Sequence, residues 1–241
     1  MVTAMFDWIR TAALLALFCA AGPAAAGSIV LWPINPTIAV EEQATALWLE
    51  NRGTEPATLQ IRALRWHQID GADRYDMQDE VVSSPPIATI PAGKRQLIRI
   101  VRRDGASMAT ERSYRLLIDE LPTMSPIHKA REANAQLAIQ MRYSIPLFTY
   151  EGPSSAPRLD LRFIASEGKR FVEIRNSGNS HARLVDLRLV HGANTFDVMT
   201  GLVGYVLPGS VMRWPLPSDT PLVGSILVKV NGADQLLSPN A

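Results

Sequence analysis

The chain has 241 residues, 47% of them hydrophobic, and its 24 Lys and Arg side chains nearly balance 23 Asp and Glu side chains. Because the charges are interspersed and leave a net charge of +1, without a basic tail or block, nucleic acid and anionic membranes are poor candidate partners. The only cysteine, Cys19, lies near the N-terminus. A disulfide framework, thiol catalysis and thiolate metal sites are therefore excluded for the rest of the chain.

Residues 1–26 are typical of a cleaved secretory signal peptide. Arg10 supplies a positive charge, "TAALLALFCAAG" is too short to span a bilayer as a mature helix, and the alanines at 24–26 form an A-x-A cleavage site. We expect the mature chain to begin at Gly27 and to be exported to a bacterial periplasm. Nothing after Gly27 resembles a membrane span, and about 215 residues suit one large domain or two of about 100 residues.

Apolar residues recur at every second position along the chain, with turn residues about every ten positions, and this pattern favours β-sandwiches. The first strand, residues 28–40, is interrupted by Pro33 and Pro36, so we expect a kinked edge strand. Further strands are predicted, in chain order, for "QATALWLEN", "ATLQIRALRWHQI", residues 95–102 and "SYRLLIDELP".

The stretch "NAQLAIQMRYSIPLF", residues 134–148, has the clearest alternation. Its odd positions from 137 to 145 are apolar or aromatic, which predicts a strand with one buried face that ends at Pro146. Periodicity alone favours the interpretation that this face fills the protein's own core. The alternative is that the strand is offered to another chain. The residues concerned are Leu137, Ile139, Met141, Tyr143 and Ile145.

The segment "TYEGPSSAPR", residues 149–158, is rich in Pro, Gly and Ser and is the best candidate for a domain boundary. Strand patterns resume after it, beginning with "LDLRFIAS" and "RFVEIRNSG" around a turn at Glu167 and Gly168. We therefore expect two all-β domains of Ig-like size. The first would span residues 27–148 and the second residues 159–241.

Motifs of enzyme active sites are missing from the sequence. It contains no nucleophile elbow, P-loop or dinucleotide-binding glycine motif. None of the four histidines has a second His or a carboxylate at metal-ligand spacing, so we expect neither a metal nor a cofactor. Asp119 and Glu120 are adjacent carboxylates, but this pattern at a strand end is typical of solvated charges. We expect no catalysis; a carbohydrate-active enzyme, with carboxylates far apart in sequence, stays open as an alternative.

Four ordered segments carry a resemblance to a known family. They are "SSPPIATIPAGKRQLIRI", "ERSYRLLIDELP", "LAIQMRYSIPLF" with its Leu-Phe pair, and "VEIRNSGNSHARL". In this order they resemble the periplasmic pilus-assembly chaperones of chaperone–usher systems. The resemblance covers essentially the whole mature chain and implies two Ig-like sandwiches in a boomerang arrangement. "LQIRALRWHQIDGAD" is more similar to the archaic branch, which is associated with spore-coat-U-type subunits.

The resemblance implies a chaperone that binds, folds and caps pilus or fimbrial subunits and delivers them to an outer-membrane usher. An incomplete Ig-like subunit exposes a groove, and an edge strand of the chaperone completes it through main-chain hydrogen bonds and side-chain pockets. This favours donation of residues 137–145 over the own-core interpretation. Because a long apolar edge strand is prone to aggregation, we also expect self-association of the free protein. An exported adhesin-like binding module is the alternative function.

Relatives in this family grip the subunit's C-terminal carboxylate with two basic residues, which correspond here to Pro36 and Pro146. The Arg that usually forms an interdomain ion pair with Glu111, the expected structural residue, corresponds to Tyr150. A guanidinium can bind a carboxylate bidentately, so other arginines are candidate anchors, although a solvated surface charge is the favoured interpretation for each of them. The alternative is that the clamp is missing and hydrophobic pockets alone hold the subunit. The candidates are Arg62, Arg65, Arg112, Arg115 and Arg142.

Arg99 is the last residue that the pattern singles out. It alternates with Leu97 and Val101, which places the three side chains on one face of a predicted strand. An arginine is unexpected on a half-buried apolar face, because burying its charge requires a partner. We therefore predict that Arg99 forms a buried structural ion pair, with subunit contact as the alternative.

Overall fold

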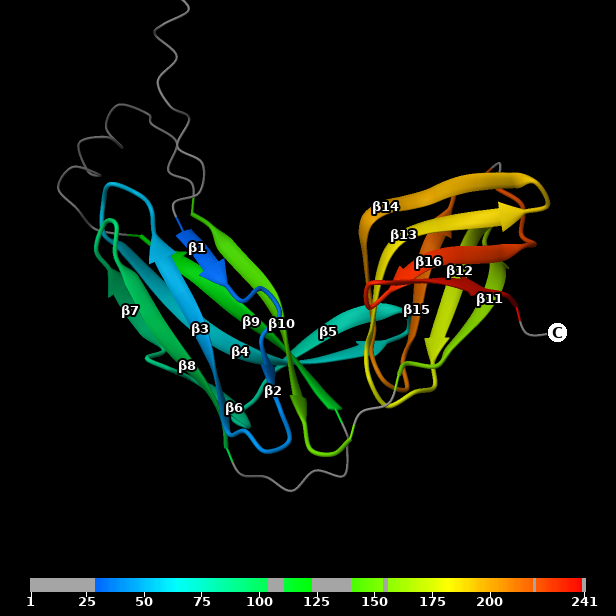
Figure 1. Ribbon diagram of the computed structural model, residues 1–241. Helices are drawn as coiled ribbons and strands as arrows, with labels where there is room; N and C mark the ends of the chain where they lie inside the picture. The colour runs from blue at the N-terminus through cyan, green and yellow to red at the C-terminus, as the bar shows by residue number, and fades with distance from the viewer. Residues whose placement is uncertain (1–28, 104–110, 123–139, 154–155, 219, 240–241) are drawn as a thin grey trace, which may run out of the picture.

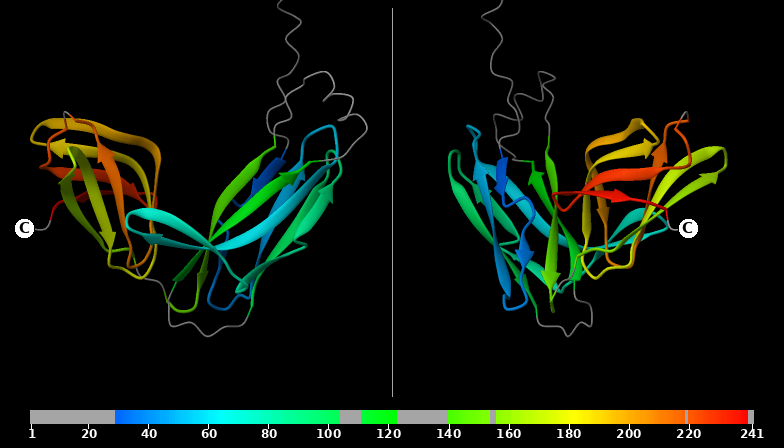
Figure 2. Two further views of the ribbon diagram at one scale, coloured as in Figure 1. Left: turned by 180° about the vertical axis from the view of Figure 1, so that it is seen from behind. Right: turned by 45° about the vertical axis from the view of Figure 1, so that its right-hand side comes forward.

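The structure, a computed structural model, describes residues 29–103, 111–122, 140–153, 156–218 and 220–239, so the predicted signal peptide lies outside the described residues. Every regular element in these ranges is a β-strand, and no helix there is long and apolar enough to cross a membrane. Two pairs of sheets form two arms that meet at an angle (Figures 1 and 2). The predicted all-β fold of two sandwiches in a boomerang arrangement is confirmed.

The first sandwich consists of two facing sheets. One sheet contains, in spatial order, β1 (Ile29–Trp32), β3 (Ala44–Asn51), β8 (Arg95–Arg102) and β6 (Val81–Ser84). The other contains β2 (Thr37–Ile38), β10 (Arg142–Tyr150), β9 (Glu111–Leu121), β4 (Ala57–Ile69) and β5 (Ala72–Met77), with β7 (Ile87–Ile90) paired to β4. The bounds of β4 and β8 agree with the two segments predicted from alternation.

Side-chain alternation explains the core between these sheets. On β3 the side chains of Leu47 and Leu49 are fully buried, whereas Trp48 between them is 37% exposed on the outer face. On β8 the buried positions are Ile98 and Ile100. Because consecutive residues point to opposite faces, each strand delivers only one of its two apolar sets to the core.

The prediction for Arg99 is wrong. It lies on the outer face of β8 and is exposed, and the described part of the chain offers it no ion-pair partner. The error arises because both faces of β8 carry apolar residues, so the pattern alone does not tell which set is buried. The neighbouring odd positions, Leu97 and Val101, are only half-buried.

Proline explains how the first strand is divided between the sheets. β1 pairs antiparallel with β3, whereas β2, beyond Pro33 and Pro36, pairs parallel with the end of β10 at Phe148 and Thr149. Both pieces lie at an edge of their sheet, as predicted for a segment that cannot donate backbone hydrogen bonds at its prolines. Because the chain passes from one sheet to the other at these prolines, β2 is short. Most of β10 therefore has no neighbour on the β2 side within the described residues.

The second sandwich also has two sheets. One contains β11 (Leu159–Ser166), β12 (Lys169–Asn176) and β15 (Val211–Leu216), and the other contains β14 (Asn194–Val206), β13 (Ala182–His191), β16 (Ser225–Val230) and β17 (Ala233–Leu237). Its core includes the buried Val172, Ile174 and Leu187. A third, smaller apolar cluster joins the two sandwiches and is formed by Trp66, Phe148, Tyr205 and Leu207, with Tyr150 packed against it.

Candidate functional site

The edge of β10 is the first part of the candidate site. β10 pairs with β9 from Arg142 to Tyr150, but on its other side it pairs with β2 only at Phe148 and Thr149 (Figure 1). Within the described residues no strand pairs with this side between Arg142 and Leu147. β10 therefore presents a free backbone edge, which is the geometry that accepts a strand from another chain.

The backbone groups on this free edge follow from one hydrogen bond. The N–H of Phe148 donates to the carbonyl of Pro36 at 3.4 Å, so it points toward the β2 side. Because the backbone groups of alternate residues point the same way, the N–H groups of Arg142 and Ser144 point to the free edge. Pro146 is the next such position and has no N–H to offer.

The prediction that the strand ends at Pro146 is wrong, since β10 continues to Tyr150, two residues into the predicted boundary segment 149–158. The nitrogen of Pro146 faces the free edge rather than β9, so its missing N–H removes no hydrogen bond from the sheet. Pro146 therefore interrupts the free edge without interrupting the strand.

The predicted donor residues divide into three groups. Ile145 is 7% exposed and lies in the core of the first sandwich, and Tyr143 packs against that core, so these two side chains follow the own-core interpretation. Met141 is 37% exposed. Leu137 and Ile139 lie outside the described residues. The donor assignment of this stretch stays a prediction.

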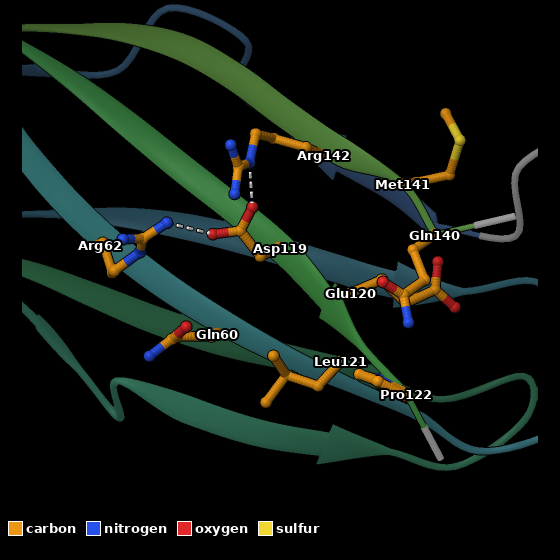
Figure 3. A pocket seen from close by; sticks show the side chains of 9 residues that line it. All are labelled: Gln60, Arg62, Asp119, Glu120, Leu121, Pro122, Gln140, Met141 and Arg142. Atoms are coloured by element: carbon orange, nitrogen blue, oxygen red, sulfur yellow. Dashed lines mark hydrogen bonds and ion pairs between the residues drawn. The ribbon is translucent and has the colours of Figure 1, made fainter.

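Two candidate anchors share one carboxylate in a hollow of about 410 Å³ beside the start of β10 (Figure 3). Asp119 accepts a hydrogen bond from the Arg62 Nη2 at 2.7 Å and another from the Arg142 Nε. Burial alone would raise the pKa of Asp119, but hydrogen bonds and charges from Arg142 and Arg62 outweigh it and hold the pKa below its usual value. This bridge ties β4, β9 and β10 together on their outer face.

Two further candidate anchors share Glu80. Its Oε2 accepts hydrogen bonds from the Tyr114 hydroxyl at 2.6 Å and the Arg65 Nη1 at 3.0 Å, and the Arg112 Nη1 lies 3.0 Å away. Desolvation would raise the pKa of Glu80, but these three donors together lower it. Arg112 also lies 3.7 Å from a carboxylate oxygen of Glu151. Four of the five candidate arginines are thus paired within the protein.

Arg115 differs from the other four candidates. Its guanidinium carbon lies 4.0 Å from the centroid of the Trp66 ring and 5.5 Å from that of Tyr205, where the two sandwiches meet. Its Nε is buried and has no hydrogen-bond partner in the described residues, a feature that it shares with Arg62. Within the described residues no carboxylate forms an ion pair with it. Arg115 is also the register partner of Pro146, one of the two positions where relatives carry a carboxylate-binding base.

Glu111 links the two sandwiches through His181, a residue that the sequence did not single out. Both carboxylate oxygens accept from the His181 backbone N–H at 3.1 Å, and the ring Nδ1 lies 2.9 Å from Oε2. The carboxylate is fully buried, and the imidazole stacks on Phe148 with ring centroids 3.5 Å apart. Burial and the neighbouring Glu111 raise the pKa of the Tyr150 hydroxyl. His181 is thus the partner of Glu111 from the second sandwich, while Tyr150 contacts the same carboxylate from β10.

No group of three or more His, Cys, Asp or Glu in the described residues could hold a metal ion. The described residues offer instead a free strand edge, a guanidinium without a carboxylate partner where the sandwiches meet, and the Glu111–His181 contact that joins the sandwiches. These are elements of a protein-binding surface.

The family "Pili and flagellar-assembly chaperone, PapD N-terminal domain" matches residues 35–151, a segment that contains β2 and all of β10. The first sandwich therefore matches this chaperone family over nearly its whole length. No curated protein sequence matches the chain.

Solved structures of pilus chaperones match nearly the whole chain. The CsuC–CsuE chaperone–tip adhesin subunit complex of the archaic Csu pili of Acinetobacter baumannii contains a chain that is 28% identical, with a TM-score of 0.73 over 89% of this chain and 100% of that chain. The CupB2 chaperone of Pseudomonas aeruginosa is 16% identical, with a TM-score of 0.61 over 88% of this chain and 100% of that one. The predicted family and its archaic branch agree with these matches.

Proposed function

We propose that this chain is a periplasmic chaperone that binds, folds and caps pilus or fimbrial subunits by lending them a strand, and then delivers them to an outer-membrane usher. The observation that carries the proposal is the free edge of β10 between Arg142 and Leu147 in a sandwich that matches this family. The N-terminal segment, residues 1–26, would direct export and be cleaved. The second sandwich would stabilise the junction and face the usher.

The free edge determines how a subunit strand would bind. An incoming strand would pair with the N–H groups of Arg142 and Ser144, while Pro146 leaves it one hydrogen bond short. Tyr143 and Ile145 keep β10 attached to the chaperone's own core, so the apolar residues upstream of them, from Met141 back to Leu137, would enter the subunit groove. Each such side chain contributes about 1.5–3 kcal/mol when buried, and association costs remove part of this.

Arg115 is the best of the five candidates for the subunit's C-terminal carboxylate. Its charge is not neutralised by a carboxylate in the described residues, and its buried Nε lacks an acceptor. The rings of Trp66 and Tyr205 hold its guanidinium plane at the junction, which reduces the entropy lost on binding. Arg62, Arg65, Arg112 and Arg142 would first have to leave their own carboxylates.

Co-expression tests the donor role. Small exported β-proteins encoded beside this chain should be recovered when it is present and degraded or aggregated when it is missing. Met141→Asp would place a charge on the donated face and should reduce recovery at least tenfold, because burying an unpaired carboxylate costs several kcal/mol. Val82→Asp, equally exposed at 37% but on β6 of the opposite sheet, is the matched control. Unchanged recovery with Met141→Asp would contradict strand donation.

A second pair of variants tests the anchor. Arg115→Ala should weaken subunit capture at least tenfold, because a charge-assisted hydrogen bond contributes about 1.5–3 kcal/mol, whereas Arg115→Lys should retain part of the affinity. Arg99→Ala removes an exposed arginine from the opposite face and should change nothing. If Arg115→Ala captures as well as the parent, this branch of the family binds without a clamp at Arg115.

Self-association of the free chain is a further part of the proposal. A free apolar edge can pair with the same edge of a second copy until a subunit replaces it. Sedimentation should show concentration-dependent dimers or larger species that disappear when a subunit is bound. A strict monomer at high concentration would count against this part, while leaving strand donation itself intact.

A further inference from the structure

The hairpin formed by β4 and β5 extends beyond the first sandwich. Pairing between β4 and β9 ends at Arg65, whereas pairing between β4 and β5 continues to Ile69 and Ala72. The end of the hairpin reaches across to β15 of the second sandwich, as the views in Figures 1 and 2 agree. There Gly71 forms an isolated parallel β-bridge with Met212. The hairpin thus belongs to one sandwich and touches the other.

Gln68 makes the polar contacts of this crossing. Its Nε2 donates to the Tyr205 carbonyl at 2.9 Å, and its Oε1 accepts from the Leu207 N–H at 2.9 Å. A side-chain amide carries both a donor and an acceptor, so it pairs with two backbone groups of the other sandwich as a neighbouring strand would. Gln68 is partly buried, which makes these bonds stronger than they would be in water.

The same glutamine is connected to the ring beneath Arg115. The Gln68 Nε2 and the Trp66 Nε1 both donate to the Asp73 Oδ1 at 2.9 Å, and the Tyr75 hydroxyl donates to Oδ2 at 3.2 Å. Asp73 therefore fixes Trp66 and Gln68 to each other. The Trp66 ring packs edge-to-face against Tyr205, the residue whose carbonyl accepts from Gln68, and both rings contact Arg115.

We propose that the β4–β5 hairpin is a strut between the sandwiches and that Gln68 is its positioning residue. The Glu111–His181 contact and the apolar cluster around Phe148 hold the sandwiches together beside the end of β10. Gln68 and Gly71 attach the second sandwich to the end of the hairpin as well, so the angle between the sandwiches and the separation of Trp66 from Tyr205 are set together. The role of the hairpin as a strut does not depend on the proposed function. Only the idea that a bound subunit requires this angle rests on the proposed function.

Distance measurement in the isolated chain tests the strut. The predicted mature chain has no cysteine, so Lys94→Cys in the first sandwich and Thr195→Cys in the second, both exposed, give one spin-label pair. The parent should show one narrow distance distribution. Gln68→Ala should broaden it. Gln78→Ala, which removes three hydrogen bonds confined to the first sandwich, should leave it unchanged.

A second pair of variants acts on the other contact of the strut. Gly71 has a φ of +76°, and a Cβ there would lie 3.4 Å from the side chain of Arg213, so Gly71→Ala should also broaden the distribution. Gly93→Ala introduces similar backbone strain at a φ of +68°, with no atom of another residue within 4 Å of its Cβ. It should leave the distribution narrow.

The outcomes are distinguishable from those of the proposed function. An unchanged distribution in both Gln68→Ala and Gly71→Ala, or equal broadening in the two controls, would overturn the strut. Failure of the chain to protect any subunit would overturn the chaperone proposal and leave the distances as predicted. If both hold, Gln68→Ala should in addition lower subunit recovery, by a smaller factor than Arg115→Ala.

Discussion

The two halves of β10 behave differently although they form one continuous strand. From Leu147 to Thr149 the residues are at most 2% exposed, and at Phe148 and Thr149 both edges of the strand are paired. From Arg142 to Ser144 the strand has one partner only, and its outer side chains are exposed. Residues 147–149 are thus held between the two sandwiches, whereas residues 142–144 have a backbone edge that is free to pair with another chain. A strand that is to be lent must be attached securely at one end.

The attachment depends on side chains that point in opposite directions. Leu147 enters the core of the first sandwich, while Phe148 points outward, into the cluster with Trp66 and Tyr205, and stacks on His181. Neighbouring residues on a strand alternate between faces, so this Leu-Phe pair connects β10 to both sandwiches at once. Upstream, only Tyr143 and Ile145 provide contacts to a core.

The largest effect is expected from removing the downstream attachment. Phe148→Ala should lower the free energy of unfolding by about 3–5 kcal/mol, because the ring is buried in the junction and stacked on an imidazole. Urea denaturation measures this change. Met141→Ala, at an exposed position of the same sheet segment, should cost less than about 1 kcal/mol. Similar costs for the two variants would show that the halves are equally well packed.

His181→Ala tests the attachment from the second sandwich. It removes the stacked ring and one of the donors to the buried Glu111 carboxylate, and it should cost about 2 kcal/mol. Urea denaturation again gives the value, and His191→Ala, an exposed histidine of the same sandwich, should be within about 0.5 kcal/mol of the parent. If the two histidine variants are equally stable, Glu111 and Phe148 do not depend on the imidazole.

The sequence predicted the strands better than their roles. Alternation placed β4 and β8 correctly, because each has a long period-two pattern between turn residues. It failed for Arg99, where both faces of the strand are apolar, and for Pro146, because the direction of a backbone nitrogen depends on which neighbour the strand pairs with. His181 had no signal of its own, since its contact with Glu111 joins residues 70 positions apart.

The five candidate arginines illustrate the same limit. Their residue type indicated carboxylate binding. Only the structure separates Arg115 from the other four, because folding brings those four to Asp119 and Glu80, which are not their neighbours in sequence. The two prolines at the positions of the usual bases were visible in the sequence. That Arg115 lies beside Pro146 was not, because the two residues are cross-strand neighbours.

Acid should weaken the upstream half through Asp119. Its folded-state pKa is lowered, so the bridge to Arg62 and Arg142 contributes fully above the unfolded-state pKa of about 4 and is lost as the pH falls through the folded value. The free energy of unfolding of the parent should therefore fall between pH 6 and pH 3 by up to about 1 kcal/mol more than that of Asp119→Asn, a modest difference because both arginines are partly exposed. Equal pH dependence of the two proteins would mean that the bridge adds nothing.

A second small effect is expected at Pro146, where the two halves of β10 meet. Pro146→Ala restores an N–H on the free edge, where an incoming strand would otherwise lack one donor. The added hydrogen bond contributes about 0.5–1.5 kcal/mol, so a purified chaperone–subunit complex should lose its subunit about two- to tenfold more slowly. The free chain should be slightly less stable, by about 0.4–1 kcal/mol, because its unfolded state gains freedom.

Pro91→Ala provides the control for this variant, since it relaxes an exposed turn between β7 and β8, neither of which pairs with β10. It should share the small loss of stability without slowing subunit release. If Pro146→Ala behaves in the same way as Pro91→Ala, pairing with the subunit ends upstream of residue 146, and the lent edge is shorter than the free one. If release slows only for Pro146→Ala, the proline limits how tightly the subunit is held. A chaperone must also release its subunit. Proline at position 146 would make release faster, because it withholds one hydrogen bond from the bound strand.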